Sequence, residues 1–81
     1  MLTGEQIRAA RALARIEQTD LAARAEVSVE TVKRLEGMRG TVAAQMATVL
    51  AIKRALEVAG VIFIDANGEG PGVRLRNFPA G

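Results

Sequence analysis

The stretch that decides the fold is QTDLAARAEVSVETVKRLEG, residues 18–37. Its apolar residues recur at a spacing that predicts two short helices, roughly Gln18–Ala25 and Val29–Glu36, which cross steeply around one small core. These apolar residues are Leu21, Ala22, Ala25, Val27, Val32 and Leu35. Ser28 stands where the second helix should begin, and its hydroxyl can cap a free backbone N–H. Gly37 stands where that helix should end, in the position of a C′ glycine. The stretch therefore predicts a helix-turn-helix.

The outer face of the second helix carries mostly polar and charged side chains. The residues expected there are Val29, Glu30, Lys33 and Arg34. Such side chains, on an exposed helix, are suited to reading base edges in the major groove of DNA. A plain helical hairpin with no such role is the alternative if the helix pattern is taken alone.

The stretch resembles the Cro/C1 repressor family, also called the XRE family, whose pattern is approximately Q-x-x-L-A-x-x-x-G-V-S-x-x-T-[VI]-x-R-[LI]-E-x-G. The matching residues are Gln18, Leu21, Ala22, Val27, Ser28, Thr31, Val32, Arg34, Leu35 and Glu36. The resemblance covers about residues 5–56. It implies a mainly α fold, with a four-helix Cro/C1-type domain that here precedes a short C-terminal β-hairpin. It also implies a sequence-specific transcription regulator that binds an inverted-repeat operator in double-stranded DNA as a homodimer.

The resemblance also assigns roles to individual residues, around a recognition helix at about residues 28–36. The residues expected at DNA are Gln18, Ser28, Val29, Glu30, Thr31, Lys33, Arg34 and Arg39. Arg34 can donate two hydrogen bonds to guanine, and Glu30 can accept a hydrogen bond from cytosine N4. Val29 can contact a thymine methyl group. The family pairs an arginine of the preceding helix with the glutamate that ends the recognition helix. Arg11 and Glu36 occupy these positions and are expected to form a partly buried ion pair.

Plain structural roles stay open for three of these residues. Glu30 could equally be a carboxylate that the N-terminal end of the helix dipole favours. Val29 could be a surface hydrophobe, and Arg39 a free loop arginine without a phosphate contact.

Two residues depart from the family pattern. Glu26 stands where the family usually has a glycine in a left-handed turn, and a non-glycine residue there costs on the order of 1 kcal/mol. Glu17 stands where serine or threonine commonly caps the first helix of the motif. Thr19 could cap a slightly later start instead.

Length and composition allow one domain with a light core. The chain has 81 residues and is 49% hydrophobic, but it contains only two Phe and no Trp or Tyr, so we expect dimerisation to supply part of its stability. It has neither Cys nor His, which removes the usual groups for zinc sites, thiol nucleophiles and imidazole catalysis. We therefore expect no enzyme, no cofactor and no metal. The net charge of +2 argues against a nonspecific polycation.

The expected location is the cytoplasm, with association to the nucleoid when DNA is bound. The first residues lack the basic and apolar segments of a signal peptide. The longest uncharged run, residues 40–52, is shorter than the roughly 20 apolar residues of a membrane span. No contact with a membrane is expected.

Helices are expected on both sides of the motif. Thr3 and Gln6 can form a capping box, followed by a helix to about residue 15. The buried stripe of this helix is expected to be Ile7, Ala10, Leu13 and Ala14. Thr41 is expected to cap a later helix over residues 42–58. That helix is apolar nearly all round, so it should be buried on more than one side.

The amino-acid composition of the chain changes after Gly60. A β-branched and aromatic run predicts a strand buried on both faces, formed by Val61, Ile62, Phe63 and Ile64. A glycine-rich turn at residues 65–72 and an alternating run at residues 73–76 complete a hairpin. Since a lone hairpin is marginal in water, we expect it to pack on the preceding helix and to form the dimer interface through Val61–Ile64.

The expected organisation is a DNA-binding part at residues 1–60, a packing and dimerising hairpin at 61–76, and a flexible tail at 77–81. Two other functions stay open. An antitoxin of a toxin–antitoxin pair would need a segment that covers the toxin, and the short tail offers little. A protein–protein adaptor could keep the helix-turn-helix without binding DNA. The sequence identifies neither the operator nor an effector.

Overall fold

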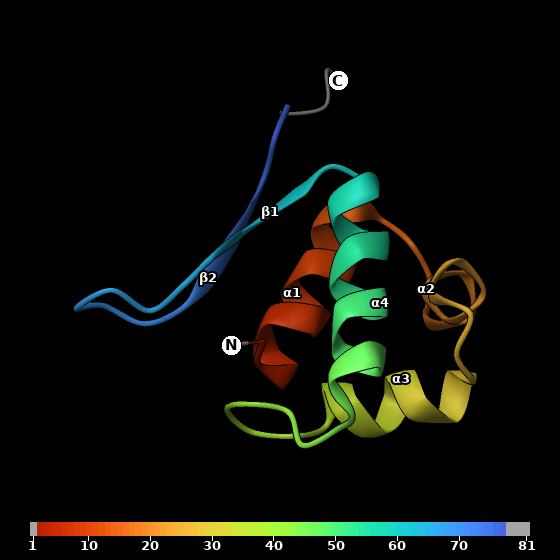
Figure 1. Ribbon diagram of the computed structural model, residues 1–81. Helices are drawn as coiled ribbons and strands as arrows, with labels where there is room; N and C mark the ends of the chain where they lie inside the picture. The colour runs from red at the N-terminus through yellow and green to blue at the C-terminus, as the bar shows by residue number, and fades with distance from the viewer. Residues whose placement is uncertain (1, 78–81) are drawn as a thin grey trace.

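Four helices and a two-stranded hairpin follow one another along residues 2–77, the part of the chain that this computed structural model describes (Figure 1). The elements are α1 (Gly4–Ala14), α2 (Gln18–Ala25), α3 (Val29–Glu36), α4 (Met46–Val58), β1 (Val61–Ile64) and β2 (Gly72–Leu75). The prediction of a mainly helical domain with a C-terminal β-hairpin is thereby confirmed. The four C-terminal residues of the predicted tail lie outside the described residues.

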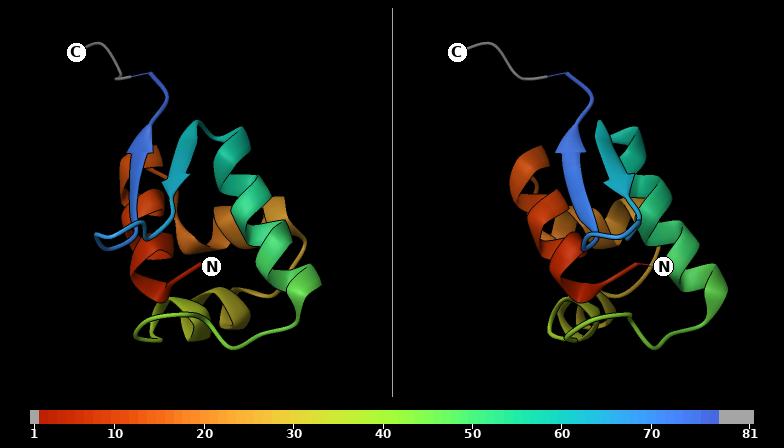
Figure 2. Two further views of the ribbon diagram at one scale, coloured as in Figure 1. Left: turned by 60° about the vertical axis from the view of Figure 1, so that its left-hand side comes forward. Right: turned by 90° about the vertical axis from the view of Figure 1, so that its left-hand side faces the viewer.

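The helices enclose a core that the hairpin covers on one side. α1 and α4 run side by side, α2 packs between α3 and α4, and α3 closes the end of the domain away from the C-terminus (Figures 1 and 2). The hairpin lies over α1 and the C-terminal part of α4 (Figure 2). The largest side chains with essentially no exposure are Ile7, Leu21, Val32, Leu35, Ile52, Leu56 and Val61. α3 therefore stands at the opposite end of the domain from the C-terminal end of β2 (Figures 1 and 2).

The predicted stripe of α1 is only partly buried. Ile7 and Ala10 are buried and Ala14 is half-buried, as expected. Leu13 is exposed, so its place in the stripe is wrong. It follows Ile7 by six positions, which turns it about 240° around a helix with about 100° per residue. This rotation takes Leu13 away from the core.

Gln6 both caps α1 and attaches the hairpin to it. The Thr3 hydroxyl accepts from the Gln6 N–H at 3.0 Å, and the Thr3 N–H donates to Gln6 Oε1 at 2.9 Å, which confirms the capping box. Gln6 Nε2 donates further to the carbonyls of Ile64 and Gly72, at 3.3 and 3.0 Å. Because Gln6 is buried, these bonds satisfy an amide that would otherwise be costly to bury. The turn end of the hairpin is thereby fixed on α1.

α4 begins at Met46, so the predicted helix from residue 42 with Thr41 as its cap is wrong. Thr41 instead pairs with Thr3 in an isolated antiparallel bridge. The Val42 N–H donates to the Leu2 carbonyl at 3.0 Å. The N-terminal segment thus uses backbone groups that would have begun a helix, and it keeps Thr41 and Val42 out of a helix.

Gly4 allows the start of α1 to approach the end of α3. A Cβ atom at this position would collide with the carbonyl of Met38 and would lie 2.7 Å from the carbonyl oxygen of Leu35. The Gly4 N–H also donates to the Gly40 carbonyl at 3.1 Å. This contact sets how closely α3 and its following loop lie against α1.

Two helices end in left-handed residues that are not glycine. Arg15 ends α1 and Glu26 ends α2, each with φ of 58°. The predicted left-handed turn at Glu26 is therefore confirmed. α3 ends at Gly37 as predicted, but Gly37 has φ of −79°, so it does not have the left-handed conformation usual for a C′ glycine. The left-handed glycine of this region is Gly40, with φ of 74°.

The start of α2 has no side-chain cap. The helix begins at Gln18, and its N-cap Glu17 makes no capping hydrogen bond from its side chain. The predicted later start, capped by Thr19, is therefore wrong.

One face of the hairpin packs on the helices and the other is open. Val61 pairs with Leu75 on the packed side, and Ile62 pairs with Arg74 on the other. Ile64 is 40% exposed, so the prediction of a strand buried on both faces is wrong for a single chain. α4 likewise leaves apolar residues exposed: Met46, Leu50 and Val58.

Candidate nucleic-acid interface

α3 presents a charged face that no other described element covers (Figure 1). Its inner face buries Val32 and Leu35 in the core. The opposite face carries Glu30, whose side chain is 80% exposed, together with the exposed Lys33 and Arg34. The helix therefore lies on the surface with its apolar side inward, as its sequence pattern predicts.

The start of α3 is organised by two hydroxyl groups. The Thr31 N–H donates to Ser28 Oγ at 3.1 Å, so the predicted N-cap is confirmed. The two hydroxyl oxygens, Ser28 Oγ and Thr31 Oγ1, are also within 2.9 Å of each other and share a hydrogen bond. A hydroxyl has one donor and two acceptor positions, so each keeps capacity to bond a partner outside the protein.

The cationic groups on and after α3 differ in how they are held. Lys33 Nζ lies 4.0 Å from Glu30 Oε1, an exposed pair that is weak in water. Within residues 2–77, no hydrogen bond or ion pair engages the side chain of Arg34 or Arg39, and both residues are exposed. These two guanidinium groups are the ones that could bind an anion or a base without first breaking a contact.

Val29 is less free than its expected place on the outer face implies. It is half-buried and packs against the core. Only part of its side chain is left to meet a thymine methyl group.

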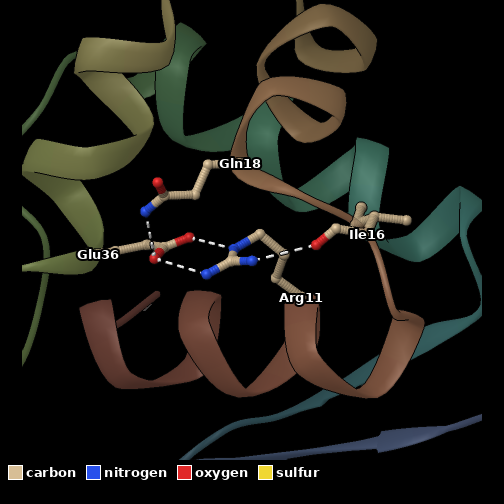
Figure 3. Close-up of polar contacts among 4 residues, drawn as sticks. All are labelled: Arg11, Ile16, Gln18 and Glu36. Atoms are coloured by element: carbon tan, nitrogen blue, oxygen red, sulfur yellow. Dashed lines mark hydrogen bonds and ion pairs between the residues drawn. The ribbon is translucent and has the colours of Figure 1, made fainter.

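Glu36 joins three helices through a buried carboxylate (Figure 3). Its oxygens accept from Arg11 Nε at 2.7 Å and from Arg11 Nη2 at 3.2 Å. The side chain of Glu36 is 5% exposed and that of Arg11 is 23% exposed, so the predicted partly buried ion pair is confirmed. The hydrogen bond to Glu36 raises the pKa of the Arg11 guanidinium above its usual value. Arg11 Nη1 also donates to the Ile16 carbonyl at 3.1 Å, and this bond holds the turn after α1.

Gln18 faces this carboxylate. Its Nε2 donates to Glu36 Oε1 at 3.0 Å, so the side chain bridges α2 and α3 (Figure 3). The resemblance implies a phosphate contact at this position. In the free protein the amide is already engaged, and it fixes the angle between the two helices of the motif.

The loop after α3 is held by a contact that sequence reasoning missed. Glu5 Oε1 accepts from the Gly40 N–H at 3.0 Å. A hydrogen bond from the backbone N–H of Glu5 itself, together with this bond from Gly40, holds the pKa of the Glu5 carboxyl below its usual value. The only local signal was an acidic residue in the first turn of α1. The contact fixes the residue next to Arg39, and so limits where that side chain can reach.

The site thus combines a rigid frame with a free surface. The frame consists of the buried face of α3, the Glu36 network and the close approach at Gly4. The surface offers two hydroxyls, one carboxylate and three cationic groups along one helix and its following loop. Hydrogen-bond donors and acceptors of these kinds match the patterns that base edges and phosphates present.

Other kinds of site find less support in the described residues. They contain no group of three or more His, Cys, Asp or Glu side chains that could hold a metal ion. None of the helices between residues 2 and 77 is long and apolar enough to cross a membrane. No family model matches the chain, and a search of curated proteins gave no significant match.

Proposed function

We propose that the protein is a sequence-specific transcription regulator of the Cro/C1 type, which binds an inverted-repeat operator as a homodimer. The observation that carries the proposal is the uncovered charged face of α3, at one end of the domain (Figure 1). The major groove of B-DNA is wide enough to admit an α-helix. A helix whose inner face is locked to its own core can enter the groove without losing its orientation.

Base reading is assigned first to Arg34. Its guanidinium is exposed and without a partner in residues 2–77, and an arginine can donate two parallel hydrogen bonds to O6 and N7 of guanine. Glu30 can accept from the N4 amino group of cytosine once it separates from Lys33. That separation costs little, because their distance of 4.0 Å in water makes a weak pair.

Positioning on the duplex is assigned to contacts with phosphates. Arg39 follows α3 on the loop that Glu5 holds through Gly40, so its reach is limited to the surface beside the recognition helix. Lys33 can bind a phosphate or a base edge from the exposed face. Such contacts fix register and orientation but carry no sequence information.

The homodimer sets the spacing of the operator. Two copies related by a two-fold axis would place two recognition helices in successive major grooves, about 34 Å apart. The operator would then be an inverted repeat with half-sites roughly ten base pairs apart.

The experiment that tests the function is selection of bound duplexes from a randomised pool. The affinity for the enriched duplexes is then measured at several salt concentrations. We expect enrichment of an inverted repeat and an affinity that falls as salt rises, because phosphate contacts release counterions. A pool without enrichment, or no salt-dependent binding, would overturn the proposal. The second outcome would instead favour a protein–protein adaptor.

A further inference from the structure

The hairpin has two outer edges that no other strand covers within residues 2–77. A two-stranded sheet leaves half of the backbone groups of each strand without a ladder partner. Such edges are templates for pairing with another strand. The question is which edge could bind a partner, and which partner.

The hydrogen-bonding pattern identifies the free groups of β1. The Arg76 N–H donates to the Gly60 carbonyl at 2.7 Å. In an antiparallel ladder, residues that bond across the pair alternate with residues that face outward. Starting from Gly60, Ile62 bonds across to β2, whereas Val61 and Phe63 turn their N–H and C=O groups to the outer edge. No backbone hydrogen bond to the rest of the described chain uses these groups.

The two edges differ in charge. Proteins commonly protect edge strands from pairing with charged side chains. β2 carries the exposed Arg74 and is followed by the exposed Arg76, so two copies of the β2 edge would repel each other. β1 carries no charged residue, and it leaves Ile64 40% exposed. Two copies can therefore pair through their β1 edges but not through their β2 edges.

The surface beside β1 is also apolar. Met46 and Leu50 of α4 are 63% and 54% exposed. Together with Phe63 they line a mostly apolar pocket of about 220 Å³ between α4 and β1, whose lining also includes the charged Lys53 and Asp65. Large exposed apolar side chains that gather in one place mark contact surfaces. The edge of β1 and this part of α4 thus form one continuous uncovered surface.

We infer that β1 pairs antiparallel with β1 of a second copy, about a two-fold axis at Ile62, to form a four-stranded sheet. In this register, Val61 of each copy bonds Phe63 of the other through both N–H and C=O groups. Four hydrogen bonds form, and all the outward-facing groups of β1 are used. Ile62 then lies directly opposite its own copy on the open face of the sheet, and the partner strand covers the pocket beside Phe63.

This interface rests on the proposed function, because that function requires a homodimer with two reading helices. The strand that forms the interface, β1, lies away from α3 (Figure 2). It can therefore be tested on the free protein, without DNA.

The test uses the absence of cysteine from the chain. In the variant Ile62→Cys, the new thiols face each other across the two-fold axis. Opposite residues in a non-hydrogen-bonded pair have Cα atoms about 4.5 Å apart, which lies within disulfide geometry. In the matched control Ile64→Cys, the two residues lie about 13 Å apart, since they are offset by four residues at about 3.3 Å each. If cross-links formed only by random collision, Ile64→Cys would cross-link faster, because Ile64 is more exposed than Ile62.

We expect mild oxidation of the full chain to cross-link Ile62→Cys rapidly and Ile64→Cys slowly or not at all. Sedimentation equilibrium of the unmodified protein should give the mass of two chains. The amide hydrogens of Val61 and Phe63 should exchange more slowly as protein concentration rises. A single-chain mass at every concentration, or faster cross-linking at position 64, would overturn the inference. If such a result accompanied selection of an inverted repeat from the duplex pool, the function would stand and only this interface would fail.

Discussion

Arg11 of α1 donates two hydrogen bonds to the carboxylate of Glu36 of α3, at 2.7 and 3.2 Å. The Glu36 side chain is almost fully buried at 5% exposure, and Gln18 supplies a third donor. The carboxylate is thus held by donors from two other helices. Its position at the end of α3 makes it the link between the stability of the domain and the orientation of the reading face.

Removal of this carboxylate should destabilise the domain strongly. Glu36→Ala strands the Arg11 guanidinium and leaves the Gln18 amide without its acceptor, so we expect a loss of about 3 kcal/mol in the free energy of unfolding. Chemical denaturation measures this loss. The control is Glu30→Ala on the same helix, whose exposed carboxylate lies 4.0 Å from Lys33 and should change stability by less than about 0.5 kcal/mol. Equal stability of the two variants would contradict the structural role of Glu36.

Replacement of the left-handed residue between the motif helices should stabilise the fold. Glu26 has φ of 58°, and glycine adopts this conformation without the steric cost of a Cβ atom. We expect Glu26→Gly to raise the free energy of unfolding by on the order of 1 kcal/mol. Base preference should stay the same, because Glu26 lies outside the face of α3. Glycine in the interior of α3, as in Lys33→Gly, should instead cost about 1 kcal/mol. An unchanged denaturation midpoint for Glu26→Gly would count against strain at this turn.

The contact between Glu5 and the loop after α3 should make the stability of the domain depend on pH in the acidic range. The ionised carboxylate accepts from its own backbone N–H and from the Gly40 N–H, and these two hydrogen bonds hold the pKa of Glu5 below its usual value. A carboxyl with a lowered pKa stabilises the fold above its unfolded-state pKa, and this contribution is lost as pH falls through the lower folded-state pKa. The stability difference between the natural protein and Glu5→Gln should thus shrink below pH 4.5.

Thermal unfolding of both proteins between neutral and acidic pH measures the difference. Glu69→Gln serves as the control, since Glu69 is an exposed residue of the hairpin turn. No hydrogen bond or ion pair within residues 2–77 engages the Glu69 side chain, so Glu69→Gln should change stability little. A Glu5→Gln difference that is constant with pH would show that the contact does not depend on the charge of the carboxyl.

The motif and its exposed face could be predicted because their signals are local. The cap at Ser28 and the apolar spacing of residues 18–36 place both helices within a few residues, and helical periodicity alone turns Lys33 and Arg34 outward. The resemblance to the Cro/C1 family supplied the ion pair of Arg11 and Glu36. Residue patterns of this kind do not depend on how the rest of the chain packs.

Several of the features that were missed depend on contacts between distant parts of the chain. Thr41 looks like a helix cap in its local sequence, but its pairing with Thr3 keeps it extended. Gln6 was predicted as a cap, and its bonds to the hairpin join residues 58 and 66 positions apart. The link between Gln18 and Glu36 likewise becomes visible only once α2 and α3 have crossed. Propensity and periodicity carry no information on such contacts.

The reading role of Arg34 can be separated from its charge. Arg34→Ala should weaken binding to the selected operator by roughly 1–3 kcal/mol and relax preference at one position in each half-site. Arg34→Lys keeps the charge but loses the planar fork, so it should retain salt-dependent binding while losing the same preference. The matched control is Arg54→Ala, because Arg54 is also exposed and lies on α4, outside the reading face. Fluorescence anisotropy with the operator and with each singly substituted operator measures both effects. If Arg34→Ala weakened binding to every sequence equally, Arg34 would be a phosphate contact, and the guanine assignment would have to move to another residue of α3.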